Sequence, residues 1–261
     1  MESAIPKSSE YGSSRHGVRV PPGTPRGTAE PRTLPRLSQL RDHETYHPSR
    51  ELPRRVLNLV VASVLLLIAA PLMLVIAVLV RLSSPGPIIY TQTRVGLDRR
   101  AGRTPRRDSR RRDDIGGSPF TIYKFRTMRV DAEQGTGAVW ASSNDSRVTP
   151  IGKVLRQFRL DELPQLFNVL RGDMNLVGPR PERPTIFADL RKQIPDYHMR
   201  QLARPGITGW AQVNQSYDTN LDDVKRKVEY DIDYIRRQGL AHDLKIMVKT
   251  VPVILFRRGG W

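Results

Sequence analysis

The chain has 261 residues, with 43 Lys and Arg against 26 Asp and Glu, so its formal net charge is +17. It contains no cysteine, which excludes a disulfide-stapled scaffold, a cysteine-ligated zinc module and a thiol nucleophile. The positive charge indicates a polyanionic partner and leaves three classes open: nucleic acid, an anionic membrane surface, or phosphorylated substrates.

The first 50 residues are rich in proline, glycine, serine and arginine and contain few apolar residues. Such a segment cannot bury enough apolar surface to offset the conformational entropy that ordering costs. Residues 1–50 are therefore predicted to be a disordered basic tail.

A long apolar run follows, from Val56 to Val80, with Asn58 and Ser63 as its polar members and no charged residue. A straight helix of this length measures roughly 37 Å, enough to cross a hydrocarbon core of ~30 Å. Hydropathy alone therefore favours a membrane-spanning helix. However, Pro71 kinks such a helix, and arginines flank both of its ends, where the positive-inside rule favours the cytoplasmic side. A helix that bends at Pro71 and returns to the same face places the arginines at both ends on the cytoplasmic side. A membrane-spanning helix and a re-entrant helix therefore both stay open.

Residues 83–261 show the mixed pattern of a small globular domain. Apolar and β-branched residues predict strands at 88–95 and 120–125. Between them, residues 94–114 hold nine Arg against four Asp. The stretch 99–117 is therefore predicted to be an Arg-rich, solvated loop insert.

Helical patterns dominate the rest of the domain. Thr149 and Pro150 form a helix start, and apolar spacing predicts a short helix over 163–170 and a longer one from Leu221 to Arg237. The apolar segment 244–256 carries interleaved lysines and suits either a membrane interface or a core helix. The expected fold is mixed α/β (α+β), mostly helical with a short β-hairpin.

Two adjacent carboxylates, Asp161 and Glu162, are expected at or beside the start of the short helix. They suit helix capping, because acids favour the positive end of a helix. They also suit chemistry: an ionised carboxylate in a positive field can attack an electrophilic phosphorus, while its neighbour helps to hold a divalent cation.

Basic residues at three further positions are candidate phosphate ligands. Lys124 and Arg126 alternate with apolar residues, so they are expected on one strand face, where they are either solvated or hold phosphate. Pro179 and Pro181 flank Arg180 in a rigid turn that is either a simple connection or a support for bidentate phosphate binding. The sequence contains no Walker-type phosphate loop and no GxGxxG pattern, so ATP hydrolysis and dinucleotide chemistry are poorly supported.

Five ordered motifs carry a resemblance to a known family. The chain closely resembles the bacterial sugar transferases, the monotopic phosphoglycosyl transferases that begin exopolysaccharide, capsule or O-antigen assembly. The resemblance covers about 200 residues, and its motifs are Lys124-Phe125-Arg126-Thr127-Met128, Arg147-Val148-Thr149-Pro150-Ile151-Gly152, Leu160-Asp161-Glu162-Leu163-Pro164-Gln165, Gly172-Asp173-Met174-Asn175-Leu176-Val177-Gly178-Pro179-Arg180-Pro181 and Arg204-Pro205-Gly206-Ile207-Thr208-Gly209-Trp210.

The resemblance implies an activity and a mechanism. Family members transfer a sugar 1-phosphate from a UDP-sugar to undecaprenyl phosphate with Mg²⁺ and release UMP. By position, Asp161 matches the nucleophile that forms an aspartyl-phosphosugar intermediate. Glu162 matches the second residue of the dyad, and the two together are the expected Mg²⁺ ligands.

The resemblance also implies substrate contacts and a location. Lys124, Arg126, Pro179 and Arg180 match positions that line the phosphate site. Residues 51–82 match a re-entrant membrane helix broken at Pro71, and residues 83–261 match a catalytic domain on the cytoplasmic face of the bacterial inner membrane. The chain departs from the family at Ala70, where serine is common, and in the Arg-rich insert.

A different class of function competes with this one: a membrane-tethered protein that binds nucleic acid or another anionic polymer. It accounts for the net charge and the arginine block but leaves the five motifs unexplained, so no nucleic acid is expected as a partner. The sequence identifies neither the sugar nor the oligomeric state.

Overall fold

The computed structural model describes residues 48–98, 117–132, 145–215, 218 and 220–255. The predicted basic tail up to residue 47 and the Arg-rich insert from 99 to 116 lie outside the described residues.

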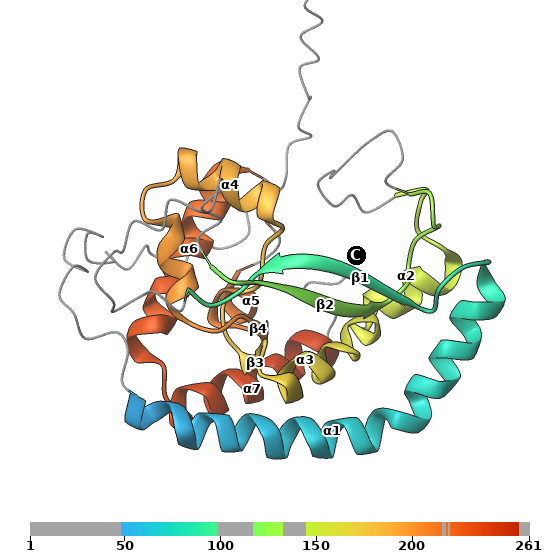
Figure 1. Cartoon of the computed structure of the whole chain (residues 1–261), viewed down its shortest axis with the longest axis horizontal. Helices are drawn as coiled ribbons and strands as arrows, with labels where there is room; N and C mark the ends of the chain where they lie inside the picture. Colours follow the sequence, from blue (N-terminus) through green and yellow to red (C-terminus); the bar gives the residue numbers. More distant parts are fainter. Residues whose placement is uncertain (1–47, 99–116, 133–144, 216–217, 219, 256–261) are drawn as a thin grey trace, which may run out of the picture. The chain divides into compact units, whose positions relative to one another are not determined.

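The longest element is α1 (Pro48–Ser83), a helix of 36 residues that contains Pro53 and Pro71. Among the described residues, it is the one helix long and apolar enough to cross a membrane. The helix continues through Pro71, because a proline removes one helical hydrogen bond without ending the helix, and Figure 1 shows one continuous, bent ribbon. A break at Pro71 in the membrane stays a prediction, and so does the re-entrant path itself.

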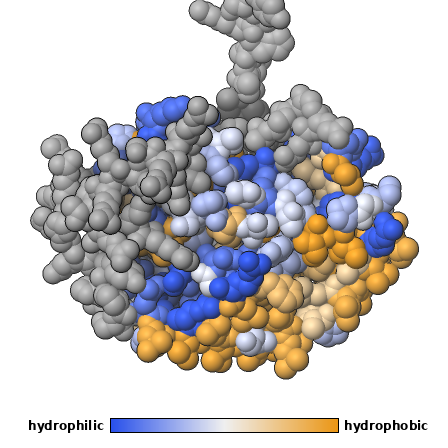
Figure 2. Space-filling view, in the orientation of Figure 1, coloured by the Kyte–Doolittle hydropathy of each residue, from blue (hydrophilic) through white to orange (hydrophobic). Residues whose placement is uncertain are grey.

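One side of α1 packs on the domain and the other is left uncovered. Ala62, Ile76 and Val80 are buried, whereas Leu67 is 78% exposed and Leu74 is 70% exposed. Figure 2 shows apolar residues gathered along the lower edge, where Figure 1 draws α1. One of the two polar residues of the apolar run, Asn58, is buried and accepts a hydrogen bond from the backbone N–H of Leu176 at 2.6 Å.

The predicted hairpin is confirmed. Strand β1 (Ile89–Val95) pairs antiparallel with β2 (Pro119–Phe125), from Ile89 opposite Phe125 to Val95 opposite Pro119. A second sheet was not predicted: β3 (Asn175–Val177) pairs in parallel with β4 (Gly206–Thr208). Each of its strands has three residues, too few for an alternating pattern.

The predicted helices are also present. Thr149 caps α2 (Pro150–Gln157) by accepting a hydrogen bond from the N–H of Gly152 at 3.0 Å. A 3₁₀ turn, η2 (Leu160–Glu162), then leads into α3 (Gln165–Arg171). Helix α6 (Leu221–Arg237) has the predicted bounds. The fold is mixed α/β and mostly helical, as expected. Its other helical elements are α4 (Pro184–Gln193), η3 (Tyr197–Leu202), α5 (Trp210–Asn214) and α7 (Leu240–Leu255).

Helix α7 combines the two alternatives that the sequence left open. Ile246 is fully buried in the main core, together with residues of α1, α3, β3 and α6. On its other side, Leu244, Val248 and Val251 are exposed. The helix therefore packs on the domain and still presents an apolar surface.

Candidate active site

The carboxylate dyad lies in the sharp turn between α2 and α3. Arg159, which precedes this turn, has a left-handed backbone with φ of 58°. Asp161 and Glu162 are only 7% and 6% exposed. Pro164 is the N-cap residue before α3, and no side-chain hydrogen bond caps this helix, so the dyad does not cap it.

Glu162 is held by cations from three segments of the chain. Its Oε1 lies 2.8 Å from Lys124 Nζ on β2 and 2.6 Å from a terminal guanidinium nitrogen of Arg180. The second terminal nitrogen of Arg180 lies 3.3 Å from Oε2, and Arg159 is 3.8 Å away. Burial alone would raise the pKa of Glu162, but Arg180 and Lys124 hold it well below its usual range. Glu162 is therefore a fixed, ionised anchor.

Asp161 has a different environment from that of its neighbour. Within the described residues it forms no hydrogen bond or ion pair, and burial raises its pKa, against the opposing charges of Lys124, Arg156 and Arg180. Two neighbouring carboxyl groups whose pKa values are pushed apart are suited to different tasks. Asp161 is the one whose oxygens are available for a substrate.

The third predicted cation, Arg126, makes other contacts. Strand β2 ends at Phe125, so Arg126 does not share a strand face with Lys124. Its guanidinium donates to the backbone carbonyls of Pro85 at 2.8 Å and Ser84 at 2.7 Å. It therefore fixes the turn that follows α1, and a contact with phosphate stays a prediction.

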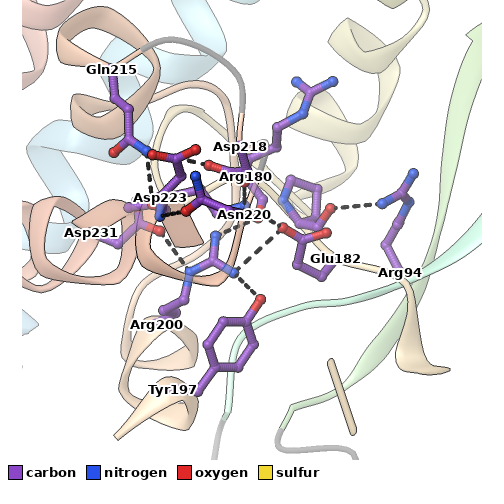
Figure 3. Close-up of polar contacts among 12 residues, drawn as sticks. Arg94, Arg180, Glu182, Tyr197, Arg200, Gln215, Asp218, Asn220, Asp223 and Asp231 are labelled. Atoms are coloured by element: carbon purple, nitrogen blue, oxygen red, sulfur yellow. Dashed lines mark hydrogen bonds and ion pairs between the residues drawn. The ribbon is translucent and has the colours of Figure 1, made fainter. Parts of the chain in front are cut away.

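The loop that carries Arg180 is held through its backbone. Four consecutive carbonyl oxygens, from Pro179 to Glu182, each accept one hydrogen bond of 3.0 Å, and all four donors lie at least 20 residues away in the sequence. The donors, in order, are the N–H of Gly206, the side chains of Arg200 and Arg94, and the N–H of Val95. Figure 3 shows Arg180 and Glu182 with Arg94 and Arg200 around them. The turn is thus a rigid support for Arg180 and not a simple connection.

Sequence reasoning missed the residues that surround this loop. Arg200 and Asp231 are buried beside it, and Lys227 is half-buried there. One signal could have revealed Asp231: it occupies a position on the apolar stripe of α6, between Val228 and Ile235. An acidic residue at a core position needs a buried partner.

The site as a whole has an excess of positive charge. Four cations, Lys124, Arg156, Arg159 and Arg180, act on the two carboxylates, a net of +2 that suits a phosphate-bearing substrate. The described part of the chain contains no group of three or more His, Cys, Asp or Glu side chains that could hold a metal ion by themselves. The dyad nevertheless fits Mg²⁺, which is commonly bound through one or two carboxylates plus substrate phosphates.

Known sugar transferases are similar to this chain over most of its length. Residues 49–257 match the family model described as bacterial sugar transferase. An N-acetylgalactosaminephosphotransferase of Aeromonas hydrophila, which uses UDP-N-acetylgalactosamine and undecaprenyl phosphate, is 43% identical over 77% of this chain. UDP-glucose:undecaprenyl-phosphate glucose-1-phosphate transferases are 40% identical, over 84% of the chain in Caulobacter vibrioides and 76% in Escherichia coli.

The relatives differ in length. The alignment covers 82% of the Caulobacter protein but 43% of the Aeromonas protein and 39% of the E. coli protein. The family match spans both the apolar helix and the whole described catalytic region. The chain therefore belongs to the bacterial sugar transferase family.

Proposed function

We propose that this protein transfers a sugar 1-phosphate from a UDP-sugar to undecaprenyl phosphate, releases UMP and so begins the assembly of an exopolysaccharide. The named relatives act on undecaprenyl phosphate with UDP-glucose or UDP-N-acetylgalactosamine. The observation that carries the proposal is the difference between the two carboxylates: Glu162 is bound by Lys124 and Arg180, while the buried Asp161 carboxylate has no hydrogen-bond or ion-pair partner among the described residues and lies beside the same cations.

The proposed reaction has two steps. In the first, a carboxylate oxygen of Asp161 attacks the β-phosphorus of the UDP-sugar. The bond from this phosphorus to the bridging oxygen breaks, and UMP leaves with the electron pair. In the second, a phosphate oxygen of undecaprenyl phosphate attacks the aspartyl-phosphosugar, and the bond to Asp161 breaks. The carboxylate is regenerated, and the product is a sugar linked to undecaprenyl diphosphate.

The surrounding residues have separate tasks. Glu162 fixes Lys124 and Arg180 at the position where phosphate charge accumulates, since its oxygens bind both. Those cations attract the diphosphate and stabilise the charge of the departing UMP. The burial of Asp161 keeps water away from the carboxylate and from its ester.

Mg²⁺ is part of the proposal. Asp161 and Glu162 offer two adjacent carboxylates. Oε1 of Glu162 is occupied by Lys124 and Arg180, whereas Oε2 accepts one hydrogen bond, from Arg180, and keeps a second lone pair for a metal ion. When bound, the ion would neutralise phosphate charge next to the dyad.

The membrane completes the proposal, because one substrate is a lipid. The uncovered apolar residues of α1 and α7 suit contact with the bilayer. On α7, Lys245 and Lys249 lie over the ring of Trp210, at 5.9 and 4.8 Å from its centre, and aromatic and basic side chains favour the membrane surface. In this proposal, the catalytic domain lies on the cytoplasmic face of the bacterial inner membrane and α1 re-enters that face.

Replacement of the nucleophile tests the proposed chemistry. With undecaprenyl phosphate and a panel of radiolabelled UDP-sugars, the wild-type protein should release UMP, and brief incubation with the donor alone should label the protein. Asp161→Asn should abolish both signals, because an amide cannot form the ester. Asp222→Asn is the matched control, since Asp222 is 82% exposed on α6. Normal transfer by Asp161→Asn would contradict the assignment.

Single cysteines test the membrane path, because the chain contains none of its own. Leu52→Cys marks the start of α1, where Leu52 is 71% exposed, and Lys192→Cys marks the catalytic domain. With a re-entrant helix, an impermeant maleimide should label both variants in inverted membrane vesicles and neither in intact spheroplasts. Labelling of the two variants from opposite sides would show that α1 spans the membrane.

A further inference from the structure

Arg200 lies at the centre of a buried polar cluster beside the active-site loop. Its side chain has no exposed surface, although it is a charged group. Its Nε donates to Asp231 at 2.6 Å, and one terminal nitrogen donates to the Tyr197 hydroxyl at 2.8 Å. The other terminal nitrogen donates to the backbone carbonyl of Arg180 at 3.0 Å (Figure 3). The planar guanidinium thus joins η3, α6 and the Arg180 loop in one fixed geometry.

Helix α6 supplies the opposite side of this cluster. Asp231 pairs with Arg200, and Lys227, one helical turn earlier, lies 3.0 Å from the carboxylate of Glu182. Lys227 also pairs with Asp218, in the segment before α6. Two cations, Arg200 and Lys227, thus pair with three acids, which are Asp231 on the helix, Glu182 on the loop and Asp218 before the helix. The helix therefore holds the loop at Glu182 directly and at Arg180 through Arg200.

The loop leaves Arg180 little freedom of its own. Prolines on both sides restrict the backbone, and the carbonyl of Arg180 accepts its hydrogen bond from Arg200. The Arg180 side chain leaves this support, is 32% exposed, and reaches Glu162. A shift of the backbone would therefore be transmitted directly to the guanidinium at the dyad.

We infer that Arg200 and Asp231 are positioning residues for the transfer reaction, and that they act through Arg180 without touching the dyad or the substrate. The inference rests on the proposed function in one respect: its kinetic test measures phosphosugar transfer. It goes beyond that function because it assigns a role in catalysis to a cluster on the far side of the loop, made by η3 and α6. The loss expected when such a support is removed is about 10- to 100-fold.

A double-mutant cycle separates positioning from simple structural support. Arg200→Lys keeps the charge but cannot reach Asp231, Tyr197 and the Arg180 carbonyl together. It should lower kcat/KM by about 10- to 100-fold in the wild-type background. In the Arg180→Ala background the same change should have an effect of about twofold or less, because the group that it positions is already gone.

The chain offers a matched control in Arg54. This arginine is also buried and also bound to an aspartate and a tyrosine, Asp243 and Tyr234. Arg54→Lys should change kcat/KM by the same factor with and without Arg180→Ala. Equal factors for Arg200→Lys in both backgrounds would overturn the inference.

Hydrogen exchange gives a second measurement that does not depend on transfer. In nanodiscs, Arg200→Lys should speed exchange in residues 176–183, whereas Arg54→Lys should speed exchange near the start of α1. Unchanged exchange in 176–183 would overturn the inference. If Arg200→Lys does not fold, Tyr197→Phe removes a single hydroxyl from the same cluster and serves in both experiments. A wild-type protein that releases no UMP would contradict the proposed function, and the exchange result would still decide the positioning role.

Discussion

Two buried arginines in this molecule have nearly the same partners but different positions. Arg54 on α1 donates to Asp243 at 2.7 Å and to the Tyr234 hydroxyl at 2.6 Å. Arg200 donates to Asp231 at 2.6 Å and to the Tyr197 hydroxyl at 2.8 Å. Each guanidinium lies close to its tyrosine ring, at 6.0 and 5.1 Å from the centre. The two clusters are therefore similar in chemistry and in burial.

The difference lies in what each cluster holds. The Arg54 cluster joins the long apolar helix α1 to α7 and, through Tyr234, to the backbone of Val177 in β3. The Arg200 cluster joins α6 to the carbonyl of Arg180 in the candidate active site. A buried ion pair adds little net stability, because desolvation offsets its attraction. What such a pair provides is a fixed arrangement: the Arg54 cluster fixes the long apolar helix α1, and the Arg200 cluster fixes one side of the candidate active site.

The largest predicted effect comes from removing the aspartate of either cluster. Asp231→Ala and Asp243→Ala each leave a buried guanidinium without its counter-charge, so each should lower the free energy of unfolding by about 3–5 kcal/mol. Denaturant unfolding in nanodiscs measures this loss. The exposed residue Asp222 provides the control, because Asp222→Ala should change stability by less than about 0.5 kcal/mol.

Asp231→Ala and Asp243→Ala should lose similar amounts of stability but differ in activity. Measured well below both melting temperatures and corrected for the folded fraction, kcat/KM should fall in Asp231→Ala and stay near the wild-type value in Asp243→Ala. Equal losses of kcat/KM in the two variants would show that the clusters do not differ in function.

A smaller loss of stability is expected at low pH. It comes from Glu182, a carboxylate beside Arg200 that becomes protonated. Burial alone would raise the pKa of Glu182, but Lys227 and Arg200 lower it to about 2 in the folded protein, from its ordinary value of 4.5. The stabilisation from this carboxylate is therefore complete above pH 4.5 and is lost as the pH falls towards 2. Between pH 7 and pH 3 the loss should be about 2 kcal/mol.

Unfolding of the wild type and of Glu182→Gln over that pH range measures the effect. The stability difference between the two proteins should shrink as the pH falls, because the glutamine variant has no carboxylate to protonate. A difference that stays constant from pH 7 to pH 3 would show that the pKa of Glu182 is not lowered by folding.

The same comparison shows what the sequence could predict. The bounds of α6, the hairpin and the dyad were predicted because each has a local signal: a repeat of apolar residues, alternation, or a motif. Asp231 breaks the apolar repeat of α6, but its partner Arg200 lies 31 residues away, and no local pattern identifies such a partner. The parallel pairing of β3 with β4 was missed for the same reason. An arginine such as Arg126 is a typical phosphate ligand. Only its hydrogen bonds to the carbonyls just after α1 show that it fixes a turn.

The smallest predicted effect compares the two tyrosine hydroxyls. The Tyr234 hydroxyl lies within 2.9 Å of Arg54, Asp243 and the carbonyl of Val177, whereas the Tyr197 hydroxyl accepts from Arg200. Loss of the more heavily bonded hydroxyl leaves more buried groups unsatisfied, so Tyr234→Phe should be less stable than Tyr197→Phe by about 1 kcal/mol. The order of activity should be reversed, with the lower kcat/KM in Tyr197→Phe, because its hydroxyl holds the guanidinium that supports Arg180. If the less stable variant were also the less active one, the activity loss would follow from general loosening of the fold, and the separation of the two clusters would fail.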